Sequence, residues 1–255
     1  MVPSSSIEEP MIELKKLTLR YGAQVIIQEA NLTILRGETC VILGPSGVGK
    51  STILRAILGL LIPAEGEVYI EGERMTGCKE KDLARFRRRM SMVFQHGALF
   101  DAMTVGQNVS FRMRELKLAH SEKIQQRIAE VLRFVGLEGT QDLKPAQLSG
   151  GMKKRVAIAR ALAPDPEIFL FDEPTVGLDP VNFYNIEQLL LKLKTRINAT
   201  LVIVTHDIES AFLLADTVVM LHQGRFIFKG SPSALKQSGD ERIRMFLNPA
   251  SAYGK

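Results

Sequence analysis

The sequence predicts an α/β fold with a mostly parallel sheet, an antiparallel β subdomain near the N-terminus and an inserted α-helical subdomain. Short, fully apolar runs at residues 40–43, 168–171 and 201–204 end in polar or glycine-rich segments, which is typical of buried parallel strands. Residues 12–20 alternate in part between apolar and polar side chains, as in a further strand. Residues 97–162 show helical spacing and no strand pattern, so we expect a helical insertion there.

A glycine-rich loop lies between the strand at residues 40–43 and a helix expected over residues 50–61. The loop fits the phosphate-binding pattern of a Gly, four residues and then Gly-Lys-Ser: Gly44-Pro45-Ser46-Gly47-Val48-Gly49-Lys50-Ser51-Thr52. Its glycines let several N–H groups face one anion, and the helix start adds about half a positive charge. Lys50 can bring an ammonium group to the outer phosphates, and the Ser51 hydroxyl can coordinate Mg²⁺. The predicted core is therefore that of a P-loop NTPase.

Three segments before residue 75 indicate strands with few helices between them, at residues 12–20, 24–35 and 67–70. Such a series predicts an antiparallel sheet beside the phosphate-loop core. Tyr21 lies between the first two strands. Its ring could stack on an adenine, or it could be an ordinary tyrosine at a strand end.

The composition of the 255-residue chain, with 45% hydrophobic residues, is sufficient for a core. Cys40 and Cys78 lack a metal-binding spacing, which favours a reduced, cytosolic compartment. No apolar run approaches the ~18–20 residues that span a bilayer. The first ten residues lack the features of a signal peptide and are expected to form a tail.

The net charge of +5 is mild, because acidic residues are interspersed along the chain. The one dense basic run lies at residues 85–89, within a helix expected over residues 82–89. This run could be a solvated helix face or could contact an anionic membrane or a partner. We expect no nucleic acid as a ligand, because no basic groove interleaved with aromatic residues is present.

A strand expected at residues 90–94 ends at Gln95, and a helix is expected to start at Thr104. Ser121 is a candidate cap for the next helix, whose apolar residues recur at helical spacing until Gly136 ends it. These helices belong to the predicted insertion at residues 97–162.

A second candidate anion site follows at Leu148-Ser149-Gly150-Gly151-Met152. Ser149 is a plausible N-cap for a helix that extends through Ala163. Gly150 and Gly151 would expose two backbone N–H groups at the positive end of that helix. Together with the phosphate loop upstream, the motif is strong evidence for a nucleotide site.

Asp172 and Glu173 end the apolar strand that starts at residue 168. Ligands bind at the carboxyl ends of strands in open α/β sheets, so these carboxylates are candidate site residues. Asp172 can hold Mg²⁺, and Glu173 can polarise an attacking water as a general base. The alternative is a pair that caps the following structure. Residues 177–180 form a turn that opens the next helix.

His206 follows the strand at residues 201–204 and could reach a γ-phosphate or the attacking water. The other histidines lack such a setting and are treated as surface or structural residues: His96, His120 and His222. Strands at residues 217–221 and 226–229 should form a hairpin, and two terminal helices should follow.

Taken in order, these motifs resemble the ATP-binding cassette family over residues 11–230. The resemblance implies roles in nucleotide and metal binding for these positions: Tyr21 (adenine stacking), residues 44–52 (phosphates), Gln95 (Mg²⁺ and the nucleophilic water), residues 148–152 (signature motif) and Asp172 (metal). It also implies Glu173 as the catalytic base, Asp179 in the turn at a dimer interface and His206 as the switch histidine. ATP is then the substrate, with Mg²⁺.

The sequence departs from the family at Met152, where Gln is usual, so polar contacts at the edge of the signature motif are in doubt. Residues 90–100, 148–155 and 172–180 are more narrowly similar to the ATPase subunit of Mla-type lipid-moving transporters, which work with MCE-domain proteins.

The resemblance implies a head-to-tail homodimer in which residues 149–151 of one copy cap the ATP on the phosphate loop of the other. It also implies a separate membrane permease that docks near residues 96–109 and places the chain peripherally on the cytoplasmic side of the inner membrane. The expected layout is a tail at residues 1–10, an ATPase domain at 11–247 and a tail at 248–255. An importer ATPase for another solute is the alternative. A nucleic-acid- or ribosome-associated cassette is weakened by the single cassette.

Overall fold

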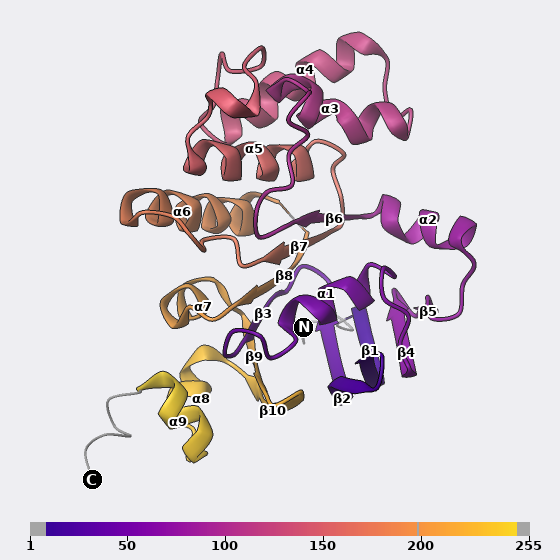
Figure 1. Cartoon of the computed structure of the whole chain (residues 1–255), viewed down its shortest axis with the longest axis vertical. Coiled ribbons are helices and arrows are strands. Elements are labelled where there is room, and N and C mark those ends of the chain that lie inside the picture. The colour runs from indigo at the N-terminus through magenta and orange to yellow at the C-terminus, as the bar shows by residue number, and fades with distance from the viewer. Residues whose placement is uncertain (1–8, 198, 249–255) are drawn as a thin grey trace, which may run out of the picture. The chain divides into compact units, whose positions relative to one another are not determined.

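The computed structural model describes residues 9–197 and 199–248, in two compact units (Figure 1). One unit comprises Met1–Phe86 with Ala199–Lys255, and the other comprises Arg87–Asn198. The terminal tails predicted at residues 1–10 and 248–255 lie mostly outside the described residues. We describe each unit separately.

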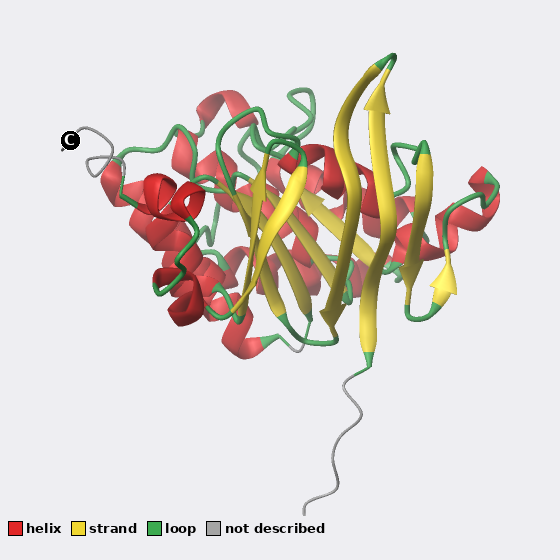
Figure 2. Cartoon of the chain, turned by 90° about the horizontal axis from the view of Figure 1, so that it is seen from below, coloured by secondary structure: helices red, strands yellow, loops and turns green. Residues whose placement is uncertain are grey.

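The first unit contains the antiparallel sheet that the sequence predicts. Its strands, drawn in yellow in Figure 2, are β1 (Pro10–Tyr21), β2 (Gln24–Leu35), β4 (Glu65–Ile70) and β5 (Glu73–Arg74), in the order β2-β1-β4-β5. Leu14 of β1 lies opposite Leu32 of β2 and Val68 of β4, and all three side chains are buried. The alternation of apolar residues in β1 therefore marks the buried face of this sheet. The two-residue strand β5 is too short to leave a signal in the sequence.

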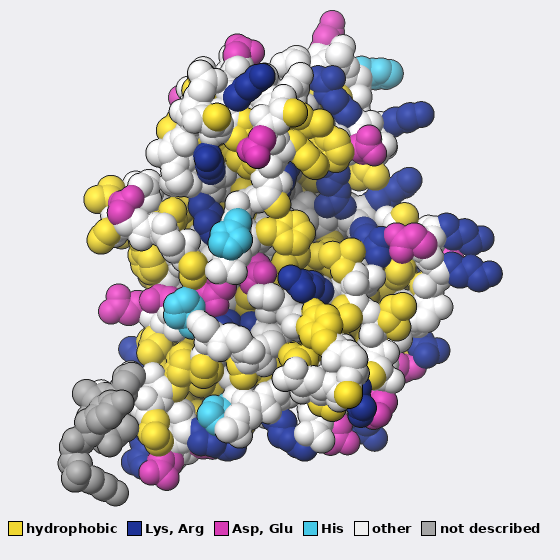
Figure 3. Space-filling model, viewed as in Figure 1, with side chains coloured by type: hydrophobic (Ala, Val, Ile, Leu, Met, Phe, Trp, Pro, Cys, Tyr) yellow, Lys and Arg dark blue, Asp and Glu magenta, His cyan; other side chains and the backbone are white. Residues whose placement is uncertain are grey.

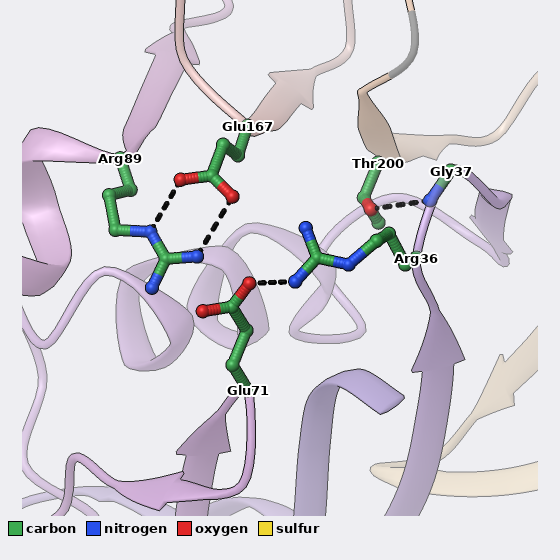
Figure 4. Close-up of polar contacts among 6 residues, drawn as sticks. All are labelled: Arg36, Gly37, Glu71, Arg89, Glu167 and Thr200. Carbon is green, nitrogen blue, oxygen red and sulfur yellow. Dashed lines mark hydrogen bonds and ion pairs between the residues drawn. The ribbon is translucent and has the colours of Figure 1, made fainter. Parts of the chain in front are cut away.

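The same unit contains four further strands: β3 (Thr39–Leu43), β8 (Thr200–Thr205), β9 (Thr217–His222) and β10 (Arg225–Gly230). β3 pairs in parallel with β8 and β9, and β9 forms the predicted hairpin with β10. Every residue of β3 is buried, which explains its unbroken apolar run. The Gly37 N–H donates to the Thr200 hydroxyl over 2.9 Å, and Arg36 pairs with Glu71 near the start of β3 (Figure 4).

The helices that lie wholly within this unit are α1 (Lys50–Ile57), α7 (Ile208–Leu214), α8 (Pro232–Lys236) and α9 (Glu241–Leu247). The prediction that α1 extends to residue 61 is wrong. Gly59 adopts a left-handed φ of 66°, which ends the helix despite the apolar residues that follow. The sequence reading also missed α7, a helix of only 7 residues in which the Asp207 side chain accepts the Ser210 N–H over 2.6 Å.

The second unit contains the parallel pair β6 (Met90–Val93) and β7 (Ile168–Asp172). Its helical elements are α3 (Val105–Glu115), α4 (Ser121–Phe134), the 3₁₀ turn η1 (Pro145–Gln147), α5 (Gly150–Leu162) and α6 (Pro180–Arg196). Arg89 forms a two-point ion pair with Glu167 at 2.6 and 2.9 Å, next to the starts of β6 and β7 (Figure 4). The parallel pairs β3–β8 and β6–β7, together with the antiparallel N-terminal sheet, confirm the predicted α/β class.

Helix starts in the second unit follow the capping residues, with one exception. Thr104 begins α3 with a capping box to Gln107, as predicted, and the turn predicted at residues 177–180 opens α6 with Asp179 as its N-cap. Ser121 is not a cap: it is the first residue of α4, and the N-cap His120 makes no side-chain bond to the helix. Gly136 follows α4 with a φ of 68°, as expected for the residue that ends a helix.

The basic run at residues 85–89 comprises the last turn of α2 (Glu80–Arg88) and the residue after it, where dark-blue side chains gather in Figure 3. Part of its charge is neutralised locally, because Arg85 pairs with Glu73 over 2.5 Å and Arg89 pairs with Glu167. None of the helices in the described parts of the chain is long and apolar enough to cross a membrane.

Candidate active site

The phosphate loop joins β3 to α1 in the first unit. Gly47 and Gly49 have left-handed φ values of 77° and 108°. A Cβ atom at Gly49 would lie 2.7 Å from Cγ2 of Ile26, so packing also requires glycine there. Gly49 caps α1 without a side-chain acceptor, which suits a helix start whose acceptor is a bound anion.

Lys50 folds back over the loop that precedes it. Its side chain is buried, and Nζ donates to the carbonyl oxygens of Gly44 and Pro45 over 2.8 and 2.9 Å. Phosphate oxygens of a nucleotide could replace these acceptors with little movement of the ammonium group. The loop therefore has the backbone and the cation that binding of a polyphosphate requires.

Tyr21 and His206 belong to the same unit as the loop. The Gly44 N–H donates to the Thr205 carbonyl over 3.3 Å, which ties the loop to the end of β8, directly before His206. Tyr21 ends β1 with 45% of its surface exposed, and its hydroxyl accepts from Arg55 of α1 over 3.2 Å. Its exposed ring is available to stack on a base, and His206 is exposed beside the loop.

In the second unit, Gln95, Asp172 and Glu173 lie at the carboxyl ends of paired strands. Val93 of β6 pairs with Phe171 of β7. Gln95 comes two residues after Val93, and the two carboxylates come directly after Phe171. Asp172 and Glu173 are both buried. Glu173 has a left-handed φ of 46°, a backbone conformation that is uncommon for a residue with a side chain and typical of functional turns.

Lys154 of α5 contacts two of these residues, and the sequence reading missed it. Its buried Nζ donates to the carbonyl oxygens of Gln95 and Glu173, the latter over 3.3 Å. Burial lowers the pKa of Lys154, whereas the carboxylates of Asp172 and Glu173 raise it by favouring the charged form. The sequence offered one signal that Lys154 is buried: it lies four residues before Ile158, on the apolar face of α5.

The signature motif forms the start of α5, where the Ser149 hydroxyl accepts the Met152 N–H over 3.3 Å. Gly151 is buried, and a Cβ atom there would lie 2.1 Å from Oδ1 of Asn182. Gly150 is exposed, and a Cβ atom there would meet nothing within 4 Å. Packing within the chain thus explains Gly151 but leaves Gly150 open to an external ligand.

Asp179, the N-cap of α6, fixes the position of Asn182, which packs against Gly151 of the signature motif. Its carboxylate accepts the N–H groups of Val181 and Asn182 over 3.1 and 3.0 Å, and the Asn182 amide over 2.5 Å. The hydrogen bonds from Asn182 lower the pKa of Asp179. The turn is therefore fixed while its acidic group stays ionised.

Oxygen donors for a cation are present in both units: the Ser51 hydroxyl in the first, and the Gln95 amide and Asp172 carboxylate in the second. Oxygen ligands suit Mg²⁺ and not the nitrogen- and sulfur-preferring metals. Among residues 9–197 and 199–248, no group of three or more His, Cys, Asp and Glu side chains could hold a metal. The oxygen donors of each unit are therefore of the type that Mg²⁺ prefers.

A family model described as "ABC transporter" matches residues 27–176. The "Intermembrane phospholipid transport system ATP-binding protein MlaF" of Haemophilus influenzae is 38% identical over 245 residues, covering 96% of this chain and 93% of the relative. The "Probable ribonucleotide transport ATP-binding protein mkl" of Mycobacterium leprae is 39% identical over 237 residues, covering 93% and 68%.

A similar solved structure is the ATP-binding cassette MJ0796, a dimer in a post-hydrolysis state bound to ADP and Pi. It superposes with a TM-score of 0.80 at 37% identity, covering 87% of this chain and 99% of that one. The resemblance to ATP-binding cassettes, and to the Mla-type ATPase subunits, is thereby confirmed. The chain belongs to the ABC transporter family, as an ATP-binding and ATP-hydrolysing member.

Proposed function

We propose that this chain powers the transport of phospholipid through a separate membrane permease by hydrolysing ATP with Mg²⁺. The observation that carries this proposal is its similarity, over nearly the full length of both chains, to an ATPase of an intermembrane phospholipid transport system. The glycine-rich loop and its buried lysine support the ATP-binding half of the proposal.

ATP is bound between two copies arranged head to tail. Residues 44–52 of one copy hold the phosphates, Tyr21 stacks on the adenine, and residues 149–151 of the other copy cap the γ-phosphate. Among the described residues, none would contact a Cβ atom added at Gly150, so the space beside this glycine can take a phosphate of the other copy. The dimeric state of the similar cassette supports it as well.

Hydrolysis is assigned to polar and charged side chains of the motifs. Glu173 acts as the general base on the attacking water, and His206 contacts the γ-phosphate. Ser51, Gln95 and Asp172 would hold Mg²⁺, which would supply positive charge to the phosphates. Loss of the γ-phosphate contact after hydrolysis lets the two copies part.

The permease docks at residues 96–109, and an MCE-domain protein belongs to the same system. This segment offers the exposed side chain of Phe100, and its backbone is fixed by Asn108, whose amide oxygen accepts the Phe100 N–H over 2.8 Å. The chain then lies peripherally on the cytoplasmic side of the inner membrane. Crosslinks from residues 96–109 that never reach a membrane protein would contradict this placement.

The test is to purify the chain with its membrane subunit and compare the wild type with Glu173→Gln. We expect Glu173→Gln to abolish steady-state hydrolysis, to retain ATP binding and to trap the closed dimer, because only the base is lost. Turnover at the wild-type rate in this variant would remove Glu173 from the mechanism. A wild-type protein that does not hydrolyse ATP would refute the proposed function.

A second cargo has one specific observation in its favour: a relative of similar identity is named as a probable ribonucleotide transporter. The same preparation distinguishes the two. Phospholipid that copurifies and stimulates hydrolysis supports the lipid cargo, whereas stimulation by a ribonucleotide other than the hydrolysed ATP supports the alternative.

A further inference from the structure

One face of α5 runs along the segment that carries Gln95. Lys154, Ala157 and Arg160 are spaced three residues apart and so lie on the same side of the helix. All three are close to residues 95–98 within the second unit. This face starts one helical turn after the tip of α5, where the signature motif lies.

The contacts on this face reach the backbone of the segment. Lys154 donates to the Gln95 carbonyl, and Arg160 donates to the carbonyls of Gly97 and Ala98 over 2.7 and 2.6 Å. A Cβ atom at Gly97 would lie 3.5 Å from that of Ala157. Gly97 and Ala98 have left-handed φ values of 73° and 47°. The segment therefore follows a bent path, and side chains of α5 hold it there by donating hydrogen bonds to the carbonyl oxygens of the segment.

Lys154 has a second acceptor at the end of β7. Its Nζ also donates to the Glu173 carbonyl over 3.3 Å, at the residue with the left-handed φ of 46°. One ammonium group thus joins α5 to the backbone of Glu173, the proposed general base, and of Gln95, a proposed Mg²⁺ ligand. Its side chain is only 7% exposed, so water cannot readily take over these bonds.

We propose that Lys154 is a positioning residue for hydrolysis, which holds Gln95 and Glu173 in a fixed relation to the signature tip of α5. When a partner's phosphates engage the tip, movement of α5 is passed to both residues through this side chain. The inference rests on the proposed roles of Gln95 and Glu173.

A lysine of the same unit provides a matched control. Lys192 donates to the Phe134 carbonyl over 3.0 Å, and its ammonium group lies 4.3 Å from the centre of the Phe134 ring. Lys192→Met therefore removes a comparable bond to a carbonyl without touching Gln95 or Glu173. Loss of general stability would affect both variants, whereas loss of positioning would affect only Lys154→Met.

The experiment measures kcat and KM for ATP, trapping by ADP and vanadate, and thermal unfolding for the full chain with its permease. Lys154→Met should lower kcat about 100-fold, because displacements near 1 Å cost about that much. The KM for ATP should change less than about twofold, because the phosphate grip is intact. Trapping should fall with kcat, Lys154→Arg should recover part of it, and Lys192→Met should keep the wild-type kcat.

A double variant tests whether Lys154 acts through Gln95. In Gln95→Ala, which keeps the carbonyl but lacks the amide, Lys154→Met should cost less than it does in the wild type. Fully additive losses would overturn the proposal. If Lys154→Met gives little folded protein, Lys154→Gln, which keeps a donor but loses the charge, should show the same loss of kcat at constant KM.

Two further outcomes would overturn the inference: a wild-type kcat in Lys154→Met, or an equal loss of kcat in Lys192→Met. These results are distinct from failure of the proposed function. That failure would appear as a wild-type protein without ATPase activity, or as a fully active Glu173→Gln.

Discussion

Adding one methyl group to Gly150 or to Gly151 should change stability in opposite directions, although the two residues are adjacent. At Gly151 the new Cβ would lie 2.1 Å from Oδ1 and 3.1 Å from Cβ of Asn182, so the side chain that bonds to Asp179 must move. At Gly150 the new Cβ would meet nothing within 4 Å.

The magnitudes follow from these distances. Because the 2.1 Å approach is far shorter than a normal contact, overpacking at Gly151 should cost about 2–3 kcal/mol. Replacing a helical glycine by alanine returns about 0.5–1 kcal/mol, which leaves a net loss of about 1–2.5 kcal/mol. In a chain of this size the Tm of Gly151→Ala should fall by about 2–10 °C. Gly150→Ala should gain up to about 1 kcal/mol and raise the Tm slightly.

Activity should not follow stability. The methyl group of Gly150→Ala would block the close approach of a partner's phosphate to the start of α5, so hydrolysis should fall about 100-fold in a protein that is more stable. The assays are thermal unfolding without nucleotide and steady-state ATPase activity. Wild-type hydrolysis in Gly150→Ala would refute capping by α5, and an unchanged Tm in Gly151→Ala would refute the packing argument.

Lys50→Ala should weaken ATP binding about 10–100-fold in an equilibrium titration, because a charge-assisted bond to phosphate contributes about 1.5–3 kcal/mol; unchanged affinity would contradict the role of Lys50. Tyr21→Ala should lose about 1–3 kcal/mol of base stacking, whereas Tyr21→Phe keeps the ring and should bind ATP nearly as well as the wild type. Equal losses in the two Tyr21 variants would point to the bond from Arg55 instead. Thiol labelling of the folded protein should modify Cys78 and spare Cys40, because burial, and secondarily Glu38, raise the pKa of the fully buried Cys40 thiol. Mass spectrometry that finds labelled Cys40 before unfolding would contradict this.

The sequence predicted most elements where one physical signal dominates. The unbroken apolar run of β3 and the turn at residues 177–180 that opens a helix depend only on local residues, and both are found in the structure. The end of α1 was wrong because the apolar residues after Leu58 seemed to continue the stripe, although Gly59 adopts the left-handed conformation that stops a helix. α7 was missed because the sequence reading treated residues 205–207 only as the end of a strand and did not recognise Asp207 as the N-cap of a helix.

The site was harder to predict where side chains act through distant backbone. Motif residues could be named because each motif has a characteristic spacing in the sequence. Lys154 could not be named, because its contacts are with two carbonyl groups that lie 59 and 19 residues away in the sequence. A lysine in a helix is usually solvated, and only its burial in the structure reveals its acceptors.

The internal bonds of Lys50 have a consequence for how nucleotide enters. The ammonium group holds the two carbonyls at the start of the loop, so contacts within the chain fix the curvature of the loop. Entry of a triphosphate then exchanges one set of oxygen acceptors for another, and little chain entropy remains to be lost. Ordering of the loop by these internal bonds thus lowers the entropic cost of nucleotide binding.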